Sequence, residues 1–258
     1  MVTIKSNQEL EIMRENAKIL AGILRRIKDE AHEGVSTLKL DTLAEKLMRE
    51  SGVDPAFKGY RGYPASVCTS INDEVVHGIP SKNRVLKRGD VLSIDTGIKR
   101  KGYFADLATT LVVGGQPSER AHKLINVAWE ALDRGIEKAV PGNRVSDISN
   151  AIGTYVESQG FSVVKTFVGH GIGRAMHEDP QVPNYGPAGK GTRLRPGMVL
   201  AIEPMVKEDR DEAEVDDDGW TVRTPHGGLA AHVEEMVLIT EQGPERLSMA
   251  NREEVLVR

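Results

Sequence analysis

The feature that most constrains the fold is an internal repeat with an offset of 108 residues. The segment LKRGDVLSID (residues 86–95) recurs as LRPGMVLAIE (residues 194–203), and its glycine and most of its apolar positions are kept. The same offset relates two glycine pairs upstream, Gly34 with Gly142 and Gly52 with Gly160. Coincidence rarely keeps one offset over a ten-residue segment and four glycines. We therefore interpret the chain as two copies of one unit, at roughly residues 6–113 and 118–240.

Each copy is expected to begin with two helices. The first helix starts near Ser6, where Ser6 and Glu9 have the spacing of a capping box. Its apolar residues recur on one face: Met13, Ala17, Leu20, Leu24, Ile27 and Ala31. Its counterpart starts at Ser118, and the second helices are expected between the paired glycines, over residues 37–51 and 145–159. Strands follow in both copies, so the sequence predicts an α/β (α+β) fold of helix-helix-strand halves with pseudo-twofold symmetry.

The two matching strands both end in a carboxylate, Asp95 in the first copy and Glu203 in the second. An ionised side chain at the end of a buried strand is costly unless it is paired or holds a metal. Equivalent strands of two related halves meet near the pseudo-twofold axis. We therefore expect Asp95 and Glu203 to converge on one central site.

Two further carboxylates are candidates for that site. If TGIKRKGYFAD forms a hairpin centred between residues 100 and 101, Asp106 lies directly opposite Asp95, with Cβ atoms about 4.5–5.5 Å apart. In the returning strand LAAHVEEMVLIT, alternation puts Glu234 on an otherwise apolar face and Glu235 on the other. A solvated edge residue is the alternative interpretation of Glu234.

The remaining candidate ligand is His170 in VGHGIG, where flanking glycines let the backbone approach closely and leave the imidazole unshielded. A phosphate-binding loop is the competing interpretation, but GHGIG lacks the GxGxxG spacing, and the chain has no HExxH motif. Four carboxylates and one imidazole form a hard, oxygen-rich set that suits Mn, Fe(II) or Co(II). Their charge balances two divalent cations, which would activate water as a nucleophile near neutral pH.

Several blocks of this sequence resemble, in the same order, the type I methionine aminopeptidases of the pita-bread metallopeptidase superfamily. The blocks span roughly residues 3–248: GYRGYPASVCTSINDEVVHGIP, the pair Asp95 and Asp106, FVGHGIGRAMHEDPQVPNYG, GMVLAIEPM, DGWTV and HVEEMV. The resemblance implies a pita-bread fold around a central antiparallel sheet, in a single catalytic domain of residues 1–258. It also implies two divalent metal ions (Co, Mn or Fe) with ligands at Asp95, Asp106, His170, Glu203 and Glu234.

The resemblance implies three catalytic residues. His77 matches a family residue near the scissile amide and the substrate's N-terminus. His177 matches one that hydrogen-bonds the substrate carbonyl and steadies the developing oxyanion. Glu203 matches a ligand that also acts as general base and moves a proton from hydroxide to the leaving amine. Without the resemblance, His77 is more simply a loop histidine before a Gly-Ile-Pro turn.

A substrate slot for the methionine side chain is also implied. Its expected lining is Tyr60, Tyr63, Cys68, Met176 and Trp220. Family members often have an aromatic residue in place of Met176, and bacterial members often have cysteine in place of Phe57. For Cys68, a small buried apolar role is an equal alternative. We expect the acidic stretch before Trp220 to be a solvated loop.

The expected function is removal of the initiator methionine from nascent polypeptides, with a small second residue favoured. Two alternatives remain: an Xaa-Pro aminopeptidase or dipeptidase of the same fold, and a non-catalytic pita-bread protein that binds peptides. The first usually has an added N-terminal domain, and the second usually lacks metal ligands that are all present here. Ribosome association is an expectation from the family alone. The duplicated halves can form the site within one chain, so we expect a monomer.

Composition argues against several other classes. The net charge of −4 disfavours nucleic-acid recognition. The single cysteine, Cys68, permits no intrachain disulfide and favours a reducing compartment. The N-terminal stretch carries charges where a signal peptide needs an apolar region, and no apolar run approaches the roughly 18 residues of a membrane span. We expect a cytoplasmic protein without membrane association.

Overall fold

The computed structural model describes residues 2–248, in which four α-helices pack against antiparallel strands. Helices α1 (Asn7–Glu30) and α2 (Thr37–Glu50) belong to the first half of the chain. Helices α3 (Glu119–Glu137) and α4 (Val145–Ser158) belong to the second half. All four lie where the sequence predicts them, and a single 3₁₀ turn, η1 (Tyr60–Gly62), precedes the strands of the first half.

The first helix of each half begins at a serine cap. At α1 the Glu9 amide donates to the Ser6 hydroxyl, and the Ser6 amide donates to the Glu9 carboxylate at 2.8 Å, so the predicted capping box is present. At α3 the Ala121 amide donates to Ser118 Oγ at 3.1 Å. All six residues predicted for the apolar face of α1 are buried. The amphipathic pattern therefore determines which side of each helix meets the strands.

Within the described residues the strands form four sheets, and every pairing in them is antiparallel. The sheet of the first half contains β1 (Asp54–Pro55), β2 (Val67–Ile71), β4 (Val91–Arg100) and β5 (Tyr103–Val112). The sheet of the second half has the order β15 (Gly243–Arg246), β14 (Glu235–Thr240), β9 (Val199–Ile202), β7 (Gly169–Gly171) and β8 (Glu178–Val182). A backbone bridge from Ala108 to Glu234 connects these two sheets.

Two smaller sheets complete the central region. One has the order β13 (Ala230–His232), β10 (Met205–Lys207) and β6 (Ser162–Val163). The other has the order β11 (Glu214–Val215), β12 (Val222–Arg223) and β3 (Glu74–Val76). The strands expected around one central sheet are thus distributed over four sheets that share their antiparallel arrangement.

Hydrogen bonds recur in the two halves at the same offset of 108 residues. The Gly34 amide donates to the Leu86 carbonyl at 2.9 Å, and the Gly142 amide donates to the Leu194 carbonyl at 3.1 Å. Isolated backbone bridges with the same offset join Ser36 to Val85 and Arg144 to Arg193. Residues that match in the sequence therefore occupy matching backbone positions in the two halves.

The β4–β5 hairpin differs from the prediction in its register. The chain turns at Lys101 and Gly102, which have φ values of 51° and 83°. Positive φ at both central residues defines the two-residue turn that suits the twist of a hairpin. As a result Asp95 lies opposite Ala108, and the predicted direct pairing with Asp106 is wrong by two residues. Because two residues are one full period of a strand, both carboxylates still face the same side.

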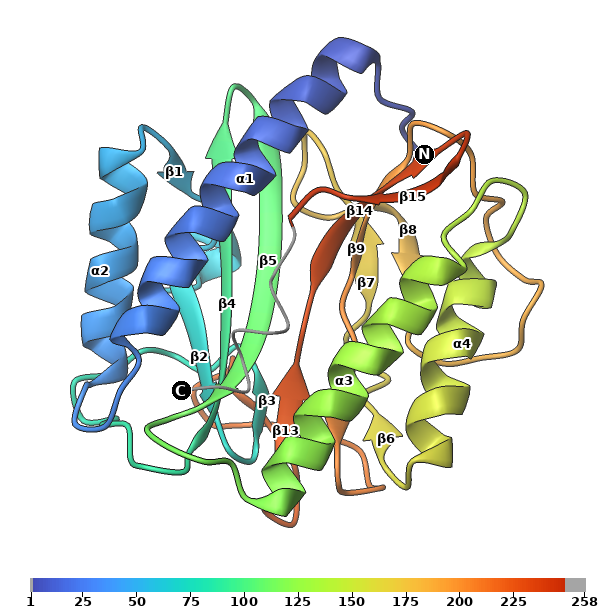
Figure 1. The fold of residues 1–258 in the computed structure, drawn as a ribbon. Coiled ribbons are helices and arrows are strands. Elements are labelled where there is room, and N and C mark those ends of the chain that lie inside the picture. The colour runs from blue at the N-terminus through green and yellow to red at the C-terminus, as the bar shows by residue number, and fades with distance from the viewer. Residues whose placement is uncertain (1, 249–258) are drawn as a thin grey trace.

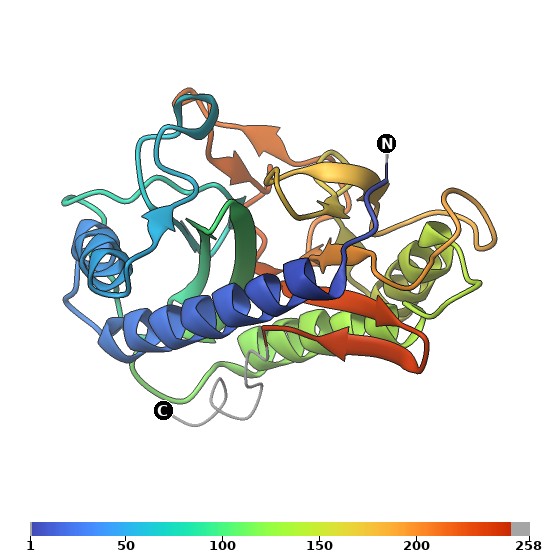
Figure 2. The same cartoon turned by 90° about the horizontal axis from the view of Figure 1, so that it is seen from above.

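The helices cover one side of the strands. Figure 1 shows α1 and α2 over the first half and α3 and α4 over the second. In Figure 2, α1 and α3 run along one side of the sheets. The main apolar core lies between these helices and the strands. Within residues 2–248, no helix is long and apolar enough to cross a membrane.

Candidate metal centre

The five side chains predicted to hold metal come from separate places in the chain and line one cavity of about 470 Å³. Asp95 lies on β4, Asp106 on β5 and His170 on β7. Glu203 directly follows β9, and Glu234 lies between β13 and β14. The structure therefore brings all five together, with two from the first half and three from the second.

The ligand atoms of this cluster are close together and withdrawn from solvent. Those of Asp106, His170 and Glu234 lie within 4.8 Å of one another, and His170 Nε2 lies 3.5 Å from Glu203 Oε1. Asp95 Oδ1 and Glu234 Oε1 are buried without a hydrogen-bond partner among the described residues. A buried carboxylate oxygen with no donor is costly, whereas a bound cation would coordinate it. The donor set therefore fits a divalent metal.

The electrostatics of the cluster lead to the same conclusion. Burial raises the pKa of Asp95, Glu203 and Glu234 above their ordinary values, and repulsion from Asp106 raises it further. Burial also raises the pKa of Asp106 to about 7. Burial lowers the pKa of His170 to about 4, so this imidazole is neutral and available as a ligand. Four carboxylates this close repel one another unless cations lie between them.

The two histidines predicted for catalysis reach the same cavity. His77 follows β3 with a positive φ of 60°, which is a strained conformation for a residue with a side chain. The ring of His177 lies 4.3 Å from that of His170 between centroids, and its Nδ1 is 2.8 Å from the Tyr60 hydroxyl. Burial lowers the pKa of His77 to about 4 and also lowers that of His177, so both rings are neutral at pH 7.

An aromatic wall forms another side of the cavity. Tyr63 and Trp220 pack edge to face with ring centroids 5.1 Å apart, and Tyr60 and Cys68 also line the cavity as predicted. Burial raises the pKa of the Cys68 thiol, so this side chain presents a neutral, polarisable surface. Met176 is buried but lies outside the cavity lining, so the structure does not bring it to the predicted slot.

Comparison with known proteins identifies the family. Residues 11–241 match metallopeptidase family M24. A methionine aminopeptidase of Clostridium acetobutylicum is 51% identical over 249 residues, which are 96% of this chain and 99% of that protein. The chain belongs to the methionine aminopeptidases. The family predicted from the sequence motifs is thereby confirmed.

Solved structures confirm the pita-bread fold. The methionine aminopeptidase from Thermotoga maritima superposes with a TM-score of 0.94 at 44% identity, covering 96% of this chain and 99% of that one. The prolidase from Pyrococcus horikoshii is more distant, with a TM-score of 0.79 at 28% identity. That match covers 98% of this chain but 65% of the prolidase. The similarity thus favours the methionine aminopeptidases over the Xaa-Pro alternative.

In this member of the family, the glycines around His170 are required by strand packing. Strand β7 lies between β8 and β9. A Cβ atom on Gly171 would lie 2.2 Å from the Asp179 carbonyl oxygen, and one on Gly169 would lie 2.5 Å from the Ala201 carbonyl oxygen. Only glycine allows backbones this close. The glycines on both sides of His170 therefore allow the close strand packing that places its ring in the cavity.

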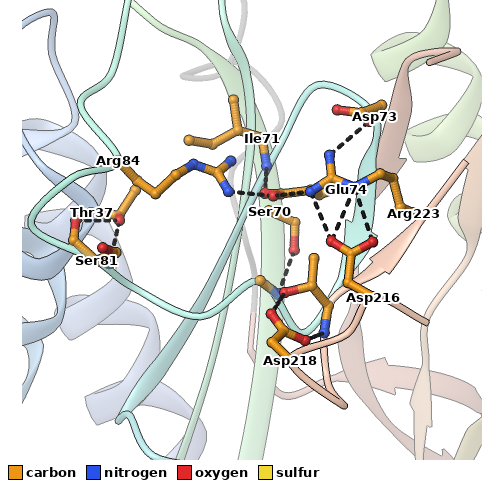
Figure 3. Close-up of polar contacts among 12 residues, drawn as sticks. Thr37, Ser70, Ile71, Asp73, Glu74, Ser81, Arg84, Asp216, Asp218 and Arg223 are labelled. Carbon is orange, nitrogen blue, oxygen red and sulfur yellow. Dashed lines mark hydrogen bonds and ion pairs between the residues drawn. The ribbon is translucent and has the colours of Figure 1, made fainter.

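An ion-pair network centred on Glu74 of β3 supports the aromatic wall (Figure 3). The Glu74 carboxylate is fully buried and accepts from Arg84 Nη1 at 2.5 Å and from Arg223 Nη2 at 2.9 Å. It also accepts from the Ile71 amide at 2.7 Å. Arg223 lies on β12 directly opposite Glu74 and pairs with Asp73 at 2.7 Å as well. The network therefore joins β3, which leads to His77, to β12, which follows Trp220.

The acidic stretch before Trp220 takes part in this network. Asp216 pairs with Arg223 at 2.9 Å (Figure 3). Asp218 accepts from the backbone amides of Trp220 and Thr221, both at 2.8 Å. Asp218 is exposed, as expected for a solvated stretch, and Asp216 is half-buried. Both carboxylates nevertheless also fix the backbone around Trp220.

The N-terminal segment supports the other wall. Glu178 Oε1 accepts from the backbone amides of Arg174 and Ala175 at 2.7 and 3.2 Å, and Glu178 Oε2 pairs with Lys5 Nζ at 2.9 Å. Lys5 precedes α1 and is buried. Residues before the first helix therefore anchor the loop that presents His177.

Sequence reasoning missed several residues that line the cavity, among them Arg61, Phe167, Met205 and His232. The alternation of side chains along a strand could have indicated His232. Residues two apart in an extended segment face the same side, and Glu234 follows His232 by two. Arg61 lies in the 3₁₀ turn η1, Phe167 in a loop and Met205 in the three-residue strand β10, where no periodic pattern marks an inward-facing side chain.

Proposed function

We propose that this protein removes the N-terminal methionine from polypeptides by metal-dependent hydrolysis of the first peptide bond, with a small second residue favoured. The observation that carries the proposal is the cluster of four carboxylates and a histidine, buried or half-buried, that lines an aromatic-walled cavity. Membership of the methionine aminopeptidases supports the choice of substrate.

Asp95, Asp106, His170, Glu203 and Glu234 would hold two divalent ions, which we take to be Co, Mn or Fe. Bound ions at this position lower the pKa of water and polarise the scissile carbonyl. The four negative charges of the cluster balance two such ions, which supports a dinuclear centre. The oxygen-rich donor set supports these metals over a tetrahedral structural zinc.

The protein's own groups would move the proton and stabilise charge. Glu203 takes a proton from the attacking water and gives it to the leaving amine, while the C–O bond forms and the C–N bond breaks. His177 donates a hydrogen bond to the developing oxyanion. We take the Tyr60 hydroxyl, which lies 2.8 Å from Nδ1, to be the donor in that contact, because the single N–H of neutral His177 is then left at Nε2. His77 is proposed to contact the substrate near the scissile amide.

We further infer that the chain acts as one catalytic domain and as a monomer in the cytoplasm, on nascent polypeptides. One chain supplies all five candidate ligands, so no second copy is needed to complete the site. The single cysteine supports a reducing compartment.

Hydrolysis of Met-Ala-Ser and of an Ala-Pro peptide, with and without chelator, tests the proposal. We expect methionine release from Met-Ala-Ser that stops in chelator, returns with Mn²⁺, Co²⁺ or anaerobic Fe²⁺, and is absent from Asp106→Asn. Preference for the Ala-Pro peptide would favour the Xaa-Pro alternative. Peptide binding without hydrolysis would favour the non-catalytic alternative, and release that chelator does not affect would contradict the metal-dependent mechanism.

A further inference from the structure

His232 is a buried, unpaired imidazole in the cavity that no step above uses. It ends strand β13, is 2% exposed, and lines the same cavity as the five candidate ligands. Neither of its ring nitrogens has a hydrogen-bond partner within residues 2–248. Buried polar groups in native proteins are nearly always hydrogen-bonded, so an unpaired ring aimed at a reaction site requires an explanation.

The backbone of His232 is held firmly by both halves of the chain. Its amide donates to Ser93 Oγ at 3.2 Å and to Thr110 Oγ1 at 3.0 Å, and its carbonyl accepts from Thr110 Oγ1 at 2.7 Å. Met205 of β10 is its neighbour across the small sheet. The position of the ring is therefore set by β4, β5 and β10 together, and not by a mobile loop.

The nearest charged group to the ring is Glu203. His232 Nε2 lies 3.5 Å from Glu203 Oε2, and His170 Nε2 lies 3.5 Å from Glu203 Oε1. Each oxygen of this carboxylate therefore faces one imidazole. A shift of a few tenths of an ångström would bring His232 within hydrogen-bond distance.

The chemistry of the pair selects one tautomer of His232. A neutral imidazole has one N–H and one acceptor nitrogen, and a carboxylate oxygen only accepts. An unprotonated Nε2 facing Glu203 Oε2 would place two lone pairs against each other. With Glu203 ionised, as it would be beside bound cations, the arrangement is favourable only when Nε2 carries the proton.

A role as an additional metal ligand is less consistent with the geometry. The ligand atoms that lie within 4.8 Å of one another belong to Asp106, His170 and Glu234, and His232 is outside that group. The ring instead approaches the oxygen of Glu203 that His170 does not face.

We propose that His232 is a positioning residue whose Nε2–H donates to Glu203 Oε2 and fixes the orientation of that carboxylate for proton transfer. This proposal rests on the proposed function, in which Glu203 is the general base. Removing such an outer partner typically costs about 10–100-fold in activity or metal affinity.

Two substitutions separate positioning from packing. His232→Gln keeps a donor near the place of Nε2, whereas His232→Leu keeps the volume and removes the donor. We expect His232→Leu to lower kcat about 10–100-fold while KM changes less than about twofold, and His232→Gln to recover most of the loss. His122→Leu is the matched control, because His122 is exposed on α3 and distant from the cavity lining. Unfolding temperatures verify that all variants fold.

Two measurements other than activity complete the test. Histidine ¹⁵N NMR of the zinc-loaded protein, with His232→Gln for assignment, should show His232 protonated at Nε2. Calorimetric titration with Mn²⁺ should show weaker binding to His232→Leu than to His232→Gln. Protonation at Nδ1 alone, or equal kcat values for the leucine and wild-type proteins, would overturn the proposal. If the wild-type protein released no methionine, the proposed function would fail while the NMR result would still decide the His232–Glu203 contact.

Discussion

Glu74→Gln is the perturbation whose effect follows most directly from the structure. It keeps the shape of the side chain and removes the charge that faces Arg84 and Arg223 at 2.5 and 2.9 Å. One oxygen becomes an NH₂ group, which must face either a guanidinium or the Ile71 amide, and all of these are donors. The substitution therefore leaves at least one buried contact between two donors.

The expected loss of stability is intermediate. Breaking a fully buried ion pair costs about 3–5 kcal/mol, and a hydrogen bond to a charged group contributes about 1.5–3 kcal/mol. The side chains of Arg84 and Arg223 are 40% and 32% exposed, so water can partly replace Glu74, and Arg223 keeps Asp73 and Asp216. We expect a loss of about 2 kcal/mol, which lowers Tm by about 4–8 °C for a chain of this size.

The same substitution should affect catalysis through the cavity wall. Strands β3 and β12 keep their backbone pairing but lose the buried side-chain ion pair between them, so Trp220 is less firmly held. If half of the lost free energy, about 1 kcal/mol, appears as weaker substrate binding at the aromatic wall, KM for a methionyl peptide rises about fivefold while kcat changes little. Trp220 fluorescence, isolated in a Trp129→Phe background because the chain has two tryptophans, should become more accessible to acrylamide.

Urea unfolding, steady-state kinetics and fluorescence quenching measure these three effects. Glu50→Gln is the control, because Glu50 is 57% exposed and 3.9 Å from Lys46, and such a surface pair contributes less than about 0.5 kcal/mol. A Glu74→Gln protein as stable as that control, with unchanged KM, would show that the network does not hold the wall.

Three further predictions concern the metal centre and its surroundings. In chelator, burial gives Asp106 a folded-state pKa of about 7, above its unfolded value. The folded state therefore holds this proton more tightly than the unfolded state does, so the contribution of Asp106 to stability is complete at low pH and is lost as pH rises through about 4 to 7. The metal-free Asp106→Asn protein should therefore become more stable than metal-free wild type as pH rises across that window, and excess Mn²⁺ should reverse the order. The contributions of the histidines cancel in the difference between the two proteins. Thermal unfolding at several pH values measures this difference, and a difference that did not vary with pH would refute the reasoning. Gly171→Ala should cost about 1–3 kcal/mol in urea unfolding and weaken Mn²⁺ binding, because the added methyl meets the Asp179 carbonyl, whereas Gly22→Ala on α1 meets nothing within 4 Å and should be neutral or stabilising. Tyr60→Phe should lower kcat about tenfold with little change in KM, because His177 loses the hydroxyl that we propose selects its tautomer, and an unchanged kcat would remove Tyr60 from the mechanism.

Much of the fold could be predicted because its determinants are local or repeated. The helices could be located from serine caps and apolar faces, and the two copies from a constant offset. None of these signals requires contacts between distant segments to be known. Asp95 and Glu203 were found through the repeat. Asp106 was assigned to the right side of its strand although the turn centre was misplaced, since an error of two residues preserves the face.

The features that could not be predicted depend on contacts between distant segments. Glu74 and Arg223 are 149 residues apart, and no spacing in the sequence pairs them. The unpaired ring of His232 becomes evident only once the neighbouring strands surround it. Met176 was placed in the slot by resemblance, but its side chain is buried outside the cavity, while Phe167 and Met205 occupy lining positions that no pattern indicated.

The division of the ligands between the two halves has a consequence for how the enzyme matures. The first half brings two candidate carboxylates and the second brings two more with the imidazole, so neither half alone offers the whole proposed ligand set. Tight capture of the cations must then come late in folding, after the halves have docked. Metal content would therefore report correct assembly of the two halves.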